Sequence, residues 1–231
     1  MVSKGQYLER PVLIASGEIC LEGLYHRGEK SRPALLLPPH PRLGGSMDSP
    51  VVAELAWALT RAGHPTLRMN YRGVGASQGA WEEGAHDLRD VRAAVEHLAE
   101  TTGAAAEGGI ALVGYSYGAH LALQALAVGL RAAAVVLIAP PISLLDPGEA
   151  LAALAATEGG FARTGEVVTF RGSEDRVAPP DEVAATFACL GEHHRGERIA
   201  GADHVFREGL QALGQQVSAV VAGDERASAS R

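Results

Sequence analysis

The sequence predicts an α/β fold in which a mostly parallel central sheet carries helices on both faces. Short apolar runs alternate with longer amphipathic or Ala-rich segments along most of the chain, as strands alternate with helices in such folds. At residues 109–130 a strand-like run passes through a Gly-containing turn directly into a helix-like segment. A length of 231 residues with 47% apolar residues suits one domain with a substantial core.

The first half of the chain begins with two short strands. Residues 12–14 and 19–25 flank a Ser-Gly turn, which predicts an antiparallel hairpin at one edge of the sheet. Residues 86–101 form the clearest amphipathic helix, because Leu88, Val91 and Val95 lie on one stripe. The other elements expected here are strands at 33–37 and 66–70, a helix at 51–62 and a polar, Gly-rich loop at 71–84.

The second half continues the alternation. We expect strands at 109–113, 132–139, 167–171 and 197–200, and helices at 119–130, 180–190 and 210–221. The segment 140–165 is short, so it predicts a short helix and a minimal lid. The whole chain, residues 1–231, is interpreted as one domain with a core at about 10–222 and a polar, frayed tail at 223–231.

Composition excludes several function classes. The net charge of −7 disfavours nucleic acid and anionic membranes as partners. The N-terminus has no apolar segment typical of a signal peptide and no run is long enough to span a membrane, so a cytoplasmic location is expected. Neither a zinc-binding motif nor a G-K-[ST] phosphate loop occurs, so no metal and no cofactor are expected. Cys20 and Cys189 are expected to be reduced, buried thiols.

The G-Y-S-Y-G motif at residues 114–118 stands between the expected strand and helix at 109–130. Strand, G-x-S-x-G, helix is the pattern of a nucleophile elbow, a sharp turn that exposes a serine hydroxyl at the carboxyl end of a strand. The motif also arises by chance in Gly-rich chains, and this chain has 28 glycines. Its context favours Ser116 as a nucleophile.

A nucleophilic serine needs a base and a group that orients the base, and in such proteins the chain order is Ser, Asp or Glu, then His. Asp175 follows the strand at 167–171 and is the expected acid, with Glu174 as the alternative. Asp181 is better placed to cap the next helix, which leaves Asp175 free for this role. His204 follows the last strand, whereas His193 and His194 precede it, at the opposite edge. We therefore expect Asp175 and His204 to join Ser116.

The oxyanion formed during acyl transfer needs two preorganised donors. The first is expected to be the backbone N–H of Tyr117, directly after the nucleophile. The second should come from the loop at residues 38–47, where three prolines lack an N–H and the backbone of His40 is the best candidate. The alternative is a rigid turn whose His40 side chain merely faces solvent.

The chain resembles α/β-hydrolase fold proteins, and more narrowly small bacterial serine hydrolases with an H-P-H-P-x-x-G-G-x-M loop, which stands here at residues 38–47. Their R-G-x-G-x-S-x-G and G-A-D-H-x-F motifs match residues 72–79 and 201–206, and the likeness spans about residues 10–222. Two positions depart from the pattern: Pro38 replaces the first histidine, and Asn70 stands where related hydrolases often carry aspartate.

These observations predict a serine hydrolase that cleaves carboxylic esters or thioesters of a small-molecule acyl substrate through a Ser116–His204–Asp175 triad. The alternatives are an amide or peptide hydrolase, an acyltransferase, or a binding protein that keeps the fold. The loop residues Arg42, Arg72 and Arg176 are expected to be solvated charges, with an anionic substrate as the other interpretation. The oligomeric state is not predicted.

Overall fold

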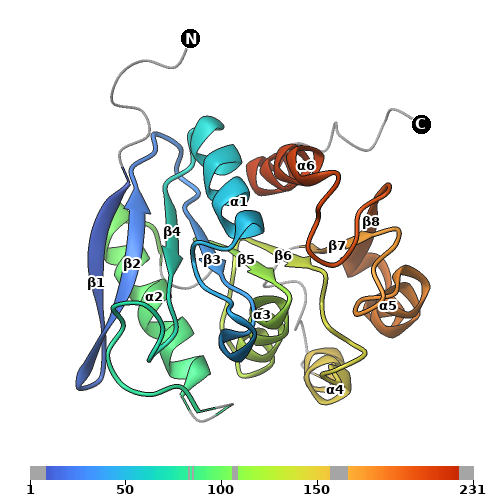
Figure 1. The fold of residues 1–231 in the computed structure, drawn as a ribbon, viewed down its shortest axis with the longest axis horizontal. Coiled ribbons are helices and arrows are strands. Elements are labelled where there is room, and N and C mark those ends of the chain that lie inside the picture. Colours follow the sequence, from blue (N-terminus) through green and yellow to red (C-terminus); the bar gives the residue numbers. More distant parts are fainter. Residues whose placement is uncertain (1–8, 83, 85, 106–108, 157–165, 224–231) are drawn as a thin grey trace.

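The computed structural model describes residues 9–82, 84, 86–105, 109–156 and 166–223. Within them, eight strands form one sheet in the spatial order β1-β2-β4-β3-β5-β6-β7-β8 (Figure 1). The strands are β1 (Arg10–Ser16), β2 (Ile19–His26), β3 (Ala34–Leu37), β4 (Thr66–Met69), β5 (Ala111–Tyr115), β6 (Ala134–Ile138), β7 (Val167–Gly172) and β8 (His194–Ile199).

The strand directions match the expected sheet. β1 and β2 form the antiparallel hairpin at one edge, turning at Gly17, whose φ of 65° suits glycine. β2 also pairs antiparallel with β4, and every later pairing is parallel. The carboxyl ends of the parallel strands therefore meet at one edge, which collects the loops that follow β3, β4, β5, β7 and β8.

Helices cover both faces of the sheet. The described helices are α1 (Pro50–Arg61), α2 (Asp87–Thr102), α3 (Tyr117–Ala127), α4 (Gly148–Ala156), α5 (Pro180–Phe187) and α6 (Leu210–Ala222). α1 and α6 pack together on one face, and α2 and α3 lie on the other (Figure 1). α4 contacts α3, and α5 contacts β8.

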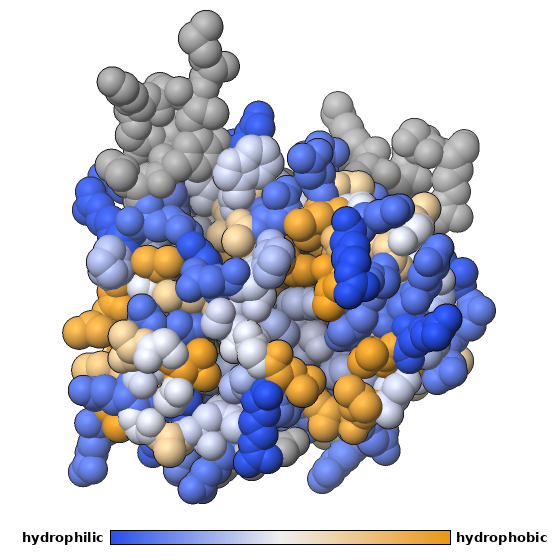
Figure 2. Space-filling model, in the orientation of Figure 1, coloured by the Kyte–Doolittle hydropathy of each residue, from blue (hydrophilic) through white to orange (hydrophobic). Residues whose placement is uncertain are grey.

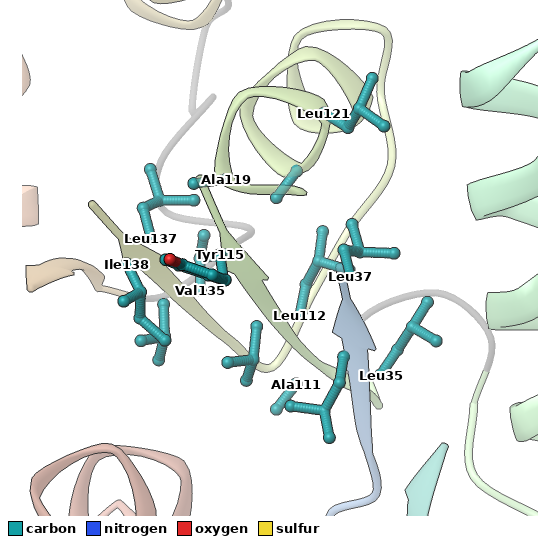
Figure 3. Packing of buried hydrophobic residues seen from close by; sticks show 14 of the residues in the cluster. Leu35, Leu37, Ala111, Leu112, Tyr115, Ala119, Leu121, Val135, Leu137 and Ile138 are labelled. Atoms are coloured by element: carbon teal, nitrogen blue, oxygen red, sulfur yellow. The ribbon is translucent and has the colours of Figure 1, made fainter. Parts of the chain in front are cut away.

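The core lies between the central strands and their helices. β3, β5 and β6 are buried along their whole length, as expected for parallel strands covered on both faces. Figure 3 shows leucines of β3, β5 and β6 grouped beside α3, which contributes Ala119 and Leu121. This packing fixes β5 and α3 relative to each other, and with them the turn that joins the two.

Hydrophilic residues cover most of the face in Figure 2, and apolar residues form small separate groups there. None of the described helices is both long and apolar enough to cross a membrane. Cys20 and Cys189 are free thiols as expected, but Cys20 is only half-buried and Cys189 is exposed, so the expectation of two buried thiols is wrong.

The last strand and the helix before it differ from the prediction. β8 begins at His194, three residues before the predicted start, because it is an edge strand whose polar residues give no apolar run. The helix predicted at 180–190 ends as α5 at Phe187 and continues as the 3₁₀ segment η2 (Ala188–His193). Gly191, with a φ of 55°, interrupts η2.

The segment 140–165 contains α4, which agrees with the short helix expected there. Its residues 157–165 lie outside the described part of the chain, as do residues 224–231 of the predicted tail. The minimal lid therefore remains a prediction.

Candidate active site

Ser116 occupies the turn between β5 and α3 (Figure 1). Its φ of 52° and ψ of −114° are unfavourable for a residue with a side chain, as an elbow requires. The N–H of Ser116 donates to the carbonyl of Ile138 at 2.8 Å, which ties the turn to β6. This hydrogen bond to the sheet helps to maintain the strained backbone conformation of Ser116.

The two glycines of the motif allow this turn because backbone atoms come too close for a side chain. A Cβ on Gly118 would overlap the carbonyl oxygen of Leu37 in β3. One on Gly114 would overlap the carbonyl of Gly118 itself. Close packing of α3 on β3 and β5 therefore explains the G-x-S-x-G spacing.

His204 lies in the loop after β8 and reaches the nucleophile. Its Nε2 is 3.0 Å from the Oγ of Ser116. Its Nδ1 is 2.9 Å and 3.1 Å from the two carboxylate oxygens of Asp175. These contacts suit the tautomer in which Nδ1–H donates to the carboxylate and Nε2 accepts the hydroxyl proton. The structure brings the three sequence-predicted residues into one hydrogen-bonded chain.

Asp175 has a second set of contacts that hold it in place. Its Oδ1 accepts the N–H groups of Val177 and Ala178, each at 2.8 Å. The Asp175 side chain is 0% exposed, whereas that of His204 is 21% exposed, so water reaches the imidazole but not the carboxylate. Glu174, the alternative acid, is exposed and uses its backbone N–H to donate to Ala202.

The helix-capping prediction for Asp181 is wrong. α5 begins at Pro180, and Asp181 instead forms an ion pair with Arg198 of β8. Asp175 itself organises the turn before the helix while also contacting His204. Gly172 allows the end of β7 to lie against the His204 loop, because a Cβ on Gly172 would overlap the carbonyl of Ala202 in that loop.

The loop after β3 brings His40 next to Tyr117. Their ring centroids are 4.8 Å apart, and the His40 ring also lies edge-on to Trp81 at 4.9 Å. The Nδ1 of His40 accepts the N–H of Arg42 at 3.2 Å, at the start of the 3₁₀ turn η1 (Pro41–Leu43). His40 is half-buried in these contacts, which rules out the alternative of a ring that merely faces solvent.

Arg42 and Arg72 have different surroundings. Arg42 is exposed, with its guanidinium 5.1 Å from the centroid of the Trp81 ring. Arg72 is buried and paired with Asp90, its Nη2 2.6 Å from Oδ1 and its Nε 2.8 Å from Oδ2. The Asp90 hydrogen bond outweighs burial and raises the pKa of Arg72. The expectation of a solvated Arg72 is wrong, because its guanidinium is buried and ion-paired.

Asn70 makes hydrogen bonds to three segments at the edge of the sheet where the parallel strands end. Its Oδ1 accepts the N–H of Met47 at 2.8 Å, and its Nδ2 donates to Glu22 Oε2 at 2.9 Å. The same Glu22 oxygen accepts the N–H of Ala76, and Ser77 Oγ donates to the Asn70 carbonyl. An aspartate could not donate to Glu22, so asparagine suits this network.

A cleft of about 700 Å³ opens beside His204, lined by loop residues 173–177 and by Asp203, His204, Val205 and Arg207. Arg207 pairs with Asp203. Although desolvation opposes it, hydrogen bonding from Arg207 and Val205 together with the Arg207 charge lowers the pKa of Asp203. Asp203 therefore stays charged in the loop that carries His204. The described residues include no group of three or more His, Cys, Asp or Glu side chains able to hold a metal.

Sequence reasoning did not identify the partners of the two tyrosines that flank Ser116. The hydroxyl of Tyr117 donates to Asp87 Oδ2 at 2.6 Å, and that of Tyr115 donates to the carbonyl of His204 at 3.0 Å. The available signal for Asp87 was its place at the start of an amphipathic helix, where acidic residues are common, so the sequence does not distinguish it.

Residues 34–229 match the profile of the Alpha/beta hydrolase family. The chain belongs to this family. Family membership and an eight-stranded, mostly parallel sheet agree with the fold predicted from sequence, and they support hydrolase activity.

Three individual relatives of this alpha/beta hydrolase match most of its length. An uncharacterized protein of Rickettsia prowazekii is 28% identical over 194 residues, 81% of this chain and 78% of that protein. An alpha-beta serine hydrolase homologue from Coxiella burnetii is 26% identical with a TM-score of 0.73, covering 94% of this chain and 98% of that one. A serine hydrolase without lid from Xanthomonas campestris, 22% identical, shares the fold with a TM-score of 0.76 over 92% and 94% of the two chains.

Proposed function

We propose that this protein is a serine hydrolase that cleaves carboxylic ester or thioester bonds through an acyl-enzyme. The observation that carries the proposal is the unbroken chain of contacts from Ser116 Oγ through the His204 ring to the buried Asp175 carboxylate. A serine hydroxyl is a weak nucleophile alone, and an adjacent base oriented by an acid is the arrangement that activates it.

In the proposed reaction Ser116 Oγ attacks the acyl carbon while its proton moves to His204 Nε2. The tetrahedral intermediate collapses as the bond to the leaving oxygen or sulfur breaks, and His204 returns the proton to the leaving group. Water, deprotonated by the same imidazole, then attacks the acyl-enzyme; the bond from the acyl carbon to Ser116 Oγ breaks, His204 returns the proton to Oγ, and the acid is released. Asp175 holds the ring in position and stabilises its positive charge at each protonated stage.

The backbone N–H groups of Tyr117 and His40 are the proposed donors to the oxyanion. The packing of the two rings at 4.8 Å supports this pairing, because it holds the β3 loop against the start of α3. The positive end of the α3 dipole favours negative charge at the same point. Each such donor contributes about 3 kcal/mol of transition-state stabilisation.

We further propose an open site with a minimal lid within residues 140–165, suited to small substrates or to extended ones with an exposed acyl group. The described part of this segment holds only the nine-residue helix α4. The fold-level likeness to a Xanthomonas campestris serine hydrolase without lid supports the same proposal.

Labelling with a fluorophosphonate probe, read by intact mass, tests the proposal. Wild-type protein should gain one adduct and Ser116→Ala should gain none. A panel of aryl esters, acyl thioesters and anilides, with and without an added alcohol acceptor, then separates ester or thioester hydrolysis from amide hydrolysis and acyl transfer. A folded wild-type protein that gains no adduct would contradict the proposal and favour a binding protein.

A further inference from the structure

The side chain of Tyr117 enters a buried polar cluster next to the elbow. Tyr117 is 3% exposed, and its hydroxyl donates to Asp87, which is 1% exposed and is the first residue of α2. Asp87 accepts two further hydrogen bonds, from Trp81 Nε1 at 3.2 Å and from the N–H of Gly84 at 3.0 Å. A buried carboxylate with three donors is a rigid anchor.

The donors to Asp87 are neutral, and among the described residues no cationic side chain forms an ion pair with it. The positive end of the α2 dipole stabilises its charge, together with the nearby charge of Arg72. Asp90, three residues later, has the contrasting arrangement: it pairs with Arg72 and accepts the Ser16 hydroxyl at 2.6 Å. The first turn of α2 thus carries two buried carboxylates, of which only Asp87 contacts the residue after the nucleophile.

The residues that donate hydrogen bonds to Asp87 also contact the loop after β3. Tyr117 and Trp81, both bound to Asp87, form the surface against which the His40 ring packs. Tyr71, which lies edge-on to Tyr117 at 6.0 Å, donates to the carbonyl of Pro38 at 3.0 Å. Burial, with the nearby Asp87 charge, raises the pKa of Tyr71 well above its ordinary value, so this phenol remains a donor.

We propose that the Tyr117–Asp87 hydrogen bond is a positioning device for the oxyanion site, aligning the backbone N–H of Tyr117 and, through the tilted and edge-on ring contacts, the backbone of His40. The inference rests on the proposed function, because it assigns a second role to the residue that supplies the first oxyanion donor. A hydroxyl bound on one side of α3 limits rotation of the first helical residue, and with it the direction of its N–H.

The test is Tyr117→Phe, which removes the hydroxyl and keeps the ring that packs on His40 and Trp81. We expect kcat for an aryl ester to fall 10- to 100-fold with KM changed less than threefold, because donors to an oxyanion act mainly in the transition state. Affinity for a trifluoromethyl ketone, which forms an anionic tetrahedral adduct on serine, should fall by a similar factor. Asp87→Ala, which removes the acceptor, should reproduce both losses.

Ser16→Ala is the matched control. It removes another buried hydroxyl-to-carboxylate bond of 2.6 Å, to Asp90 on the same turn of α2, away from the elbow. It should lower the melting temperature about as much as Tyr117→Phe does, and leave kcat and ketone affinity unchanged.

The outcomes are distinct. If Tyr117→Phe is destabilised like Ser16→Ala but keeps wild-type kcat and ketone affinity, the bond is only structural and the inference is wrong. If Tyr117→Phe does not fold, the same comparison is made with Asp87→Ala, and wild-type kinetics there would overturn the inference. Wild-type protein that fails to label at Ser116 would contradict the proposed function itself, a result separate from any difference between variants.

Discussion

The phenol of Tyr115 donates a hydrogen bond to the backbone carbonyl of His204 at 3.0 Å. Tyr115 precedes the nucleophile, so the last strand residue before the elbow holds the loop that carries the proposed base. Burial, then the charges of Asp175 and Asp203, raises the pKa of Tyr115, which keeps the phenol protonated and able to donate. One side of the elbow is thereby tied to His204 and the other, through Tyr117, to Asp87.

Tyr115→Phe should therefore lower kcat about 10-fold and the free energy of unfolding by about 1 kcal/mol, the usual cost of one lost hydrogen bond. Steady-state kinetics and urea unfolding measure the two effects. Tyr25→Phe, which removes a hydroxyl from β2, should leave kcat unchanged. An unchanged kcat in Tyr115→Phe would show that the His204 loop holds its position without this bond.

Asp175→Asn separates two roles of the Asp175 side chain: accepting the N–H groups of its own turn and orienting His204. Asparagine keeps an oxygen for the N–H groups of Val177 and Ala178, so the turn should survive and the melting temperature should change little. Its amide nitrogen would face His204 Nδ1 and favour the wrong tautomer, lowering kcat on the order of 10³- to 10⁴-fold.

Single-turnover acylation of Ser116 measures this loss, and Asp175→Ala is the comparison. Alanine should lose activity to a similar extent and, unlike asparagine, should also destabilise the turn. A kcat in Asp175→Asn within tenfold of wild type would mean that another group orients His204.

The triad could be predicted from sequence because a parallel sheet collects the carboxyl ends of its strands at one edge. Once Ser116, Asp175 and His204 are each placed after a strand, proximity follows from topology. The structure shows these three side chains in contact. Their catalytic roles remain predictions that the labelling and kinetic experiments test.

What the sequence could not reveal depends on contacts between distant segments. Asp87 and Tyr117 are separated by thirty positions, and nothing local to either residue signals their hydrogen bond. Arg72 was misjudged because a charged loop residue is usually solvated, and only the fold brings it to Asp90. The start of β8 was missed because an edge strand needs no apolar run.

Asn70→Asp should destabilise the protein by about 1–3 kcal/mol at pH 7. The new carboxylate would lie within hydrogen-bond distance of Glu22 Oε2, replacing a 2.9 Å hydrogen bond by a like-charge contact. Urea unfolding at pH 7 and pH 4 measures the effect, which should shrink at the lower pH as one carboxyl gains a proton. Adding Glu22→Gln should restore most of the loss, whereas equal destabilisation with and without it would exclude charge repulsion as the cause.

His194 should make the protein less stable in mild acid. Burial, aided by the charge of Arg171, lowers the pKa of His194 from 6.5 to about 4. The ring packs on Phe187, and its Nε2 lies 2.9 Å from the hydroxyl of Thr169. Because the unfolded chain takes up the proton near pH 6.5 and the folded one only near pH 4, stability is full above pH 6.5 and falls as the pH drops through that window.

The loss is about 1–2 kcal/mol after allowance for solvent screening of a partly exposed ring. His194→Gln keeps a polar group for Thr169 but does not titrate. Its free energy of unfolding should therefore fall less than that of wild type between pH 7 and pH 4.5, by about that amount. Urea unfolding of both proteins across this range measures the difference. Parallel curves would mean that protonated His194 is tolerated in the fold, because every other titrating group is common to the two proteins.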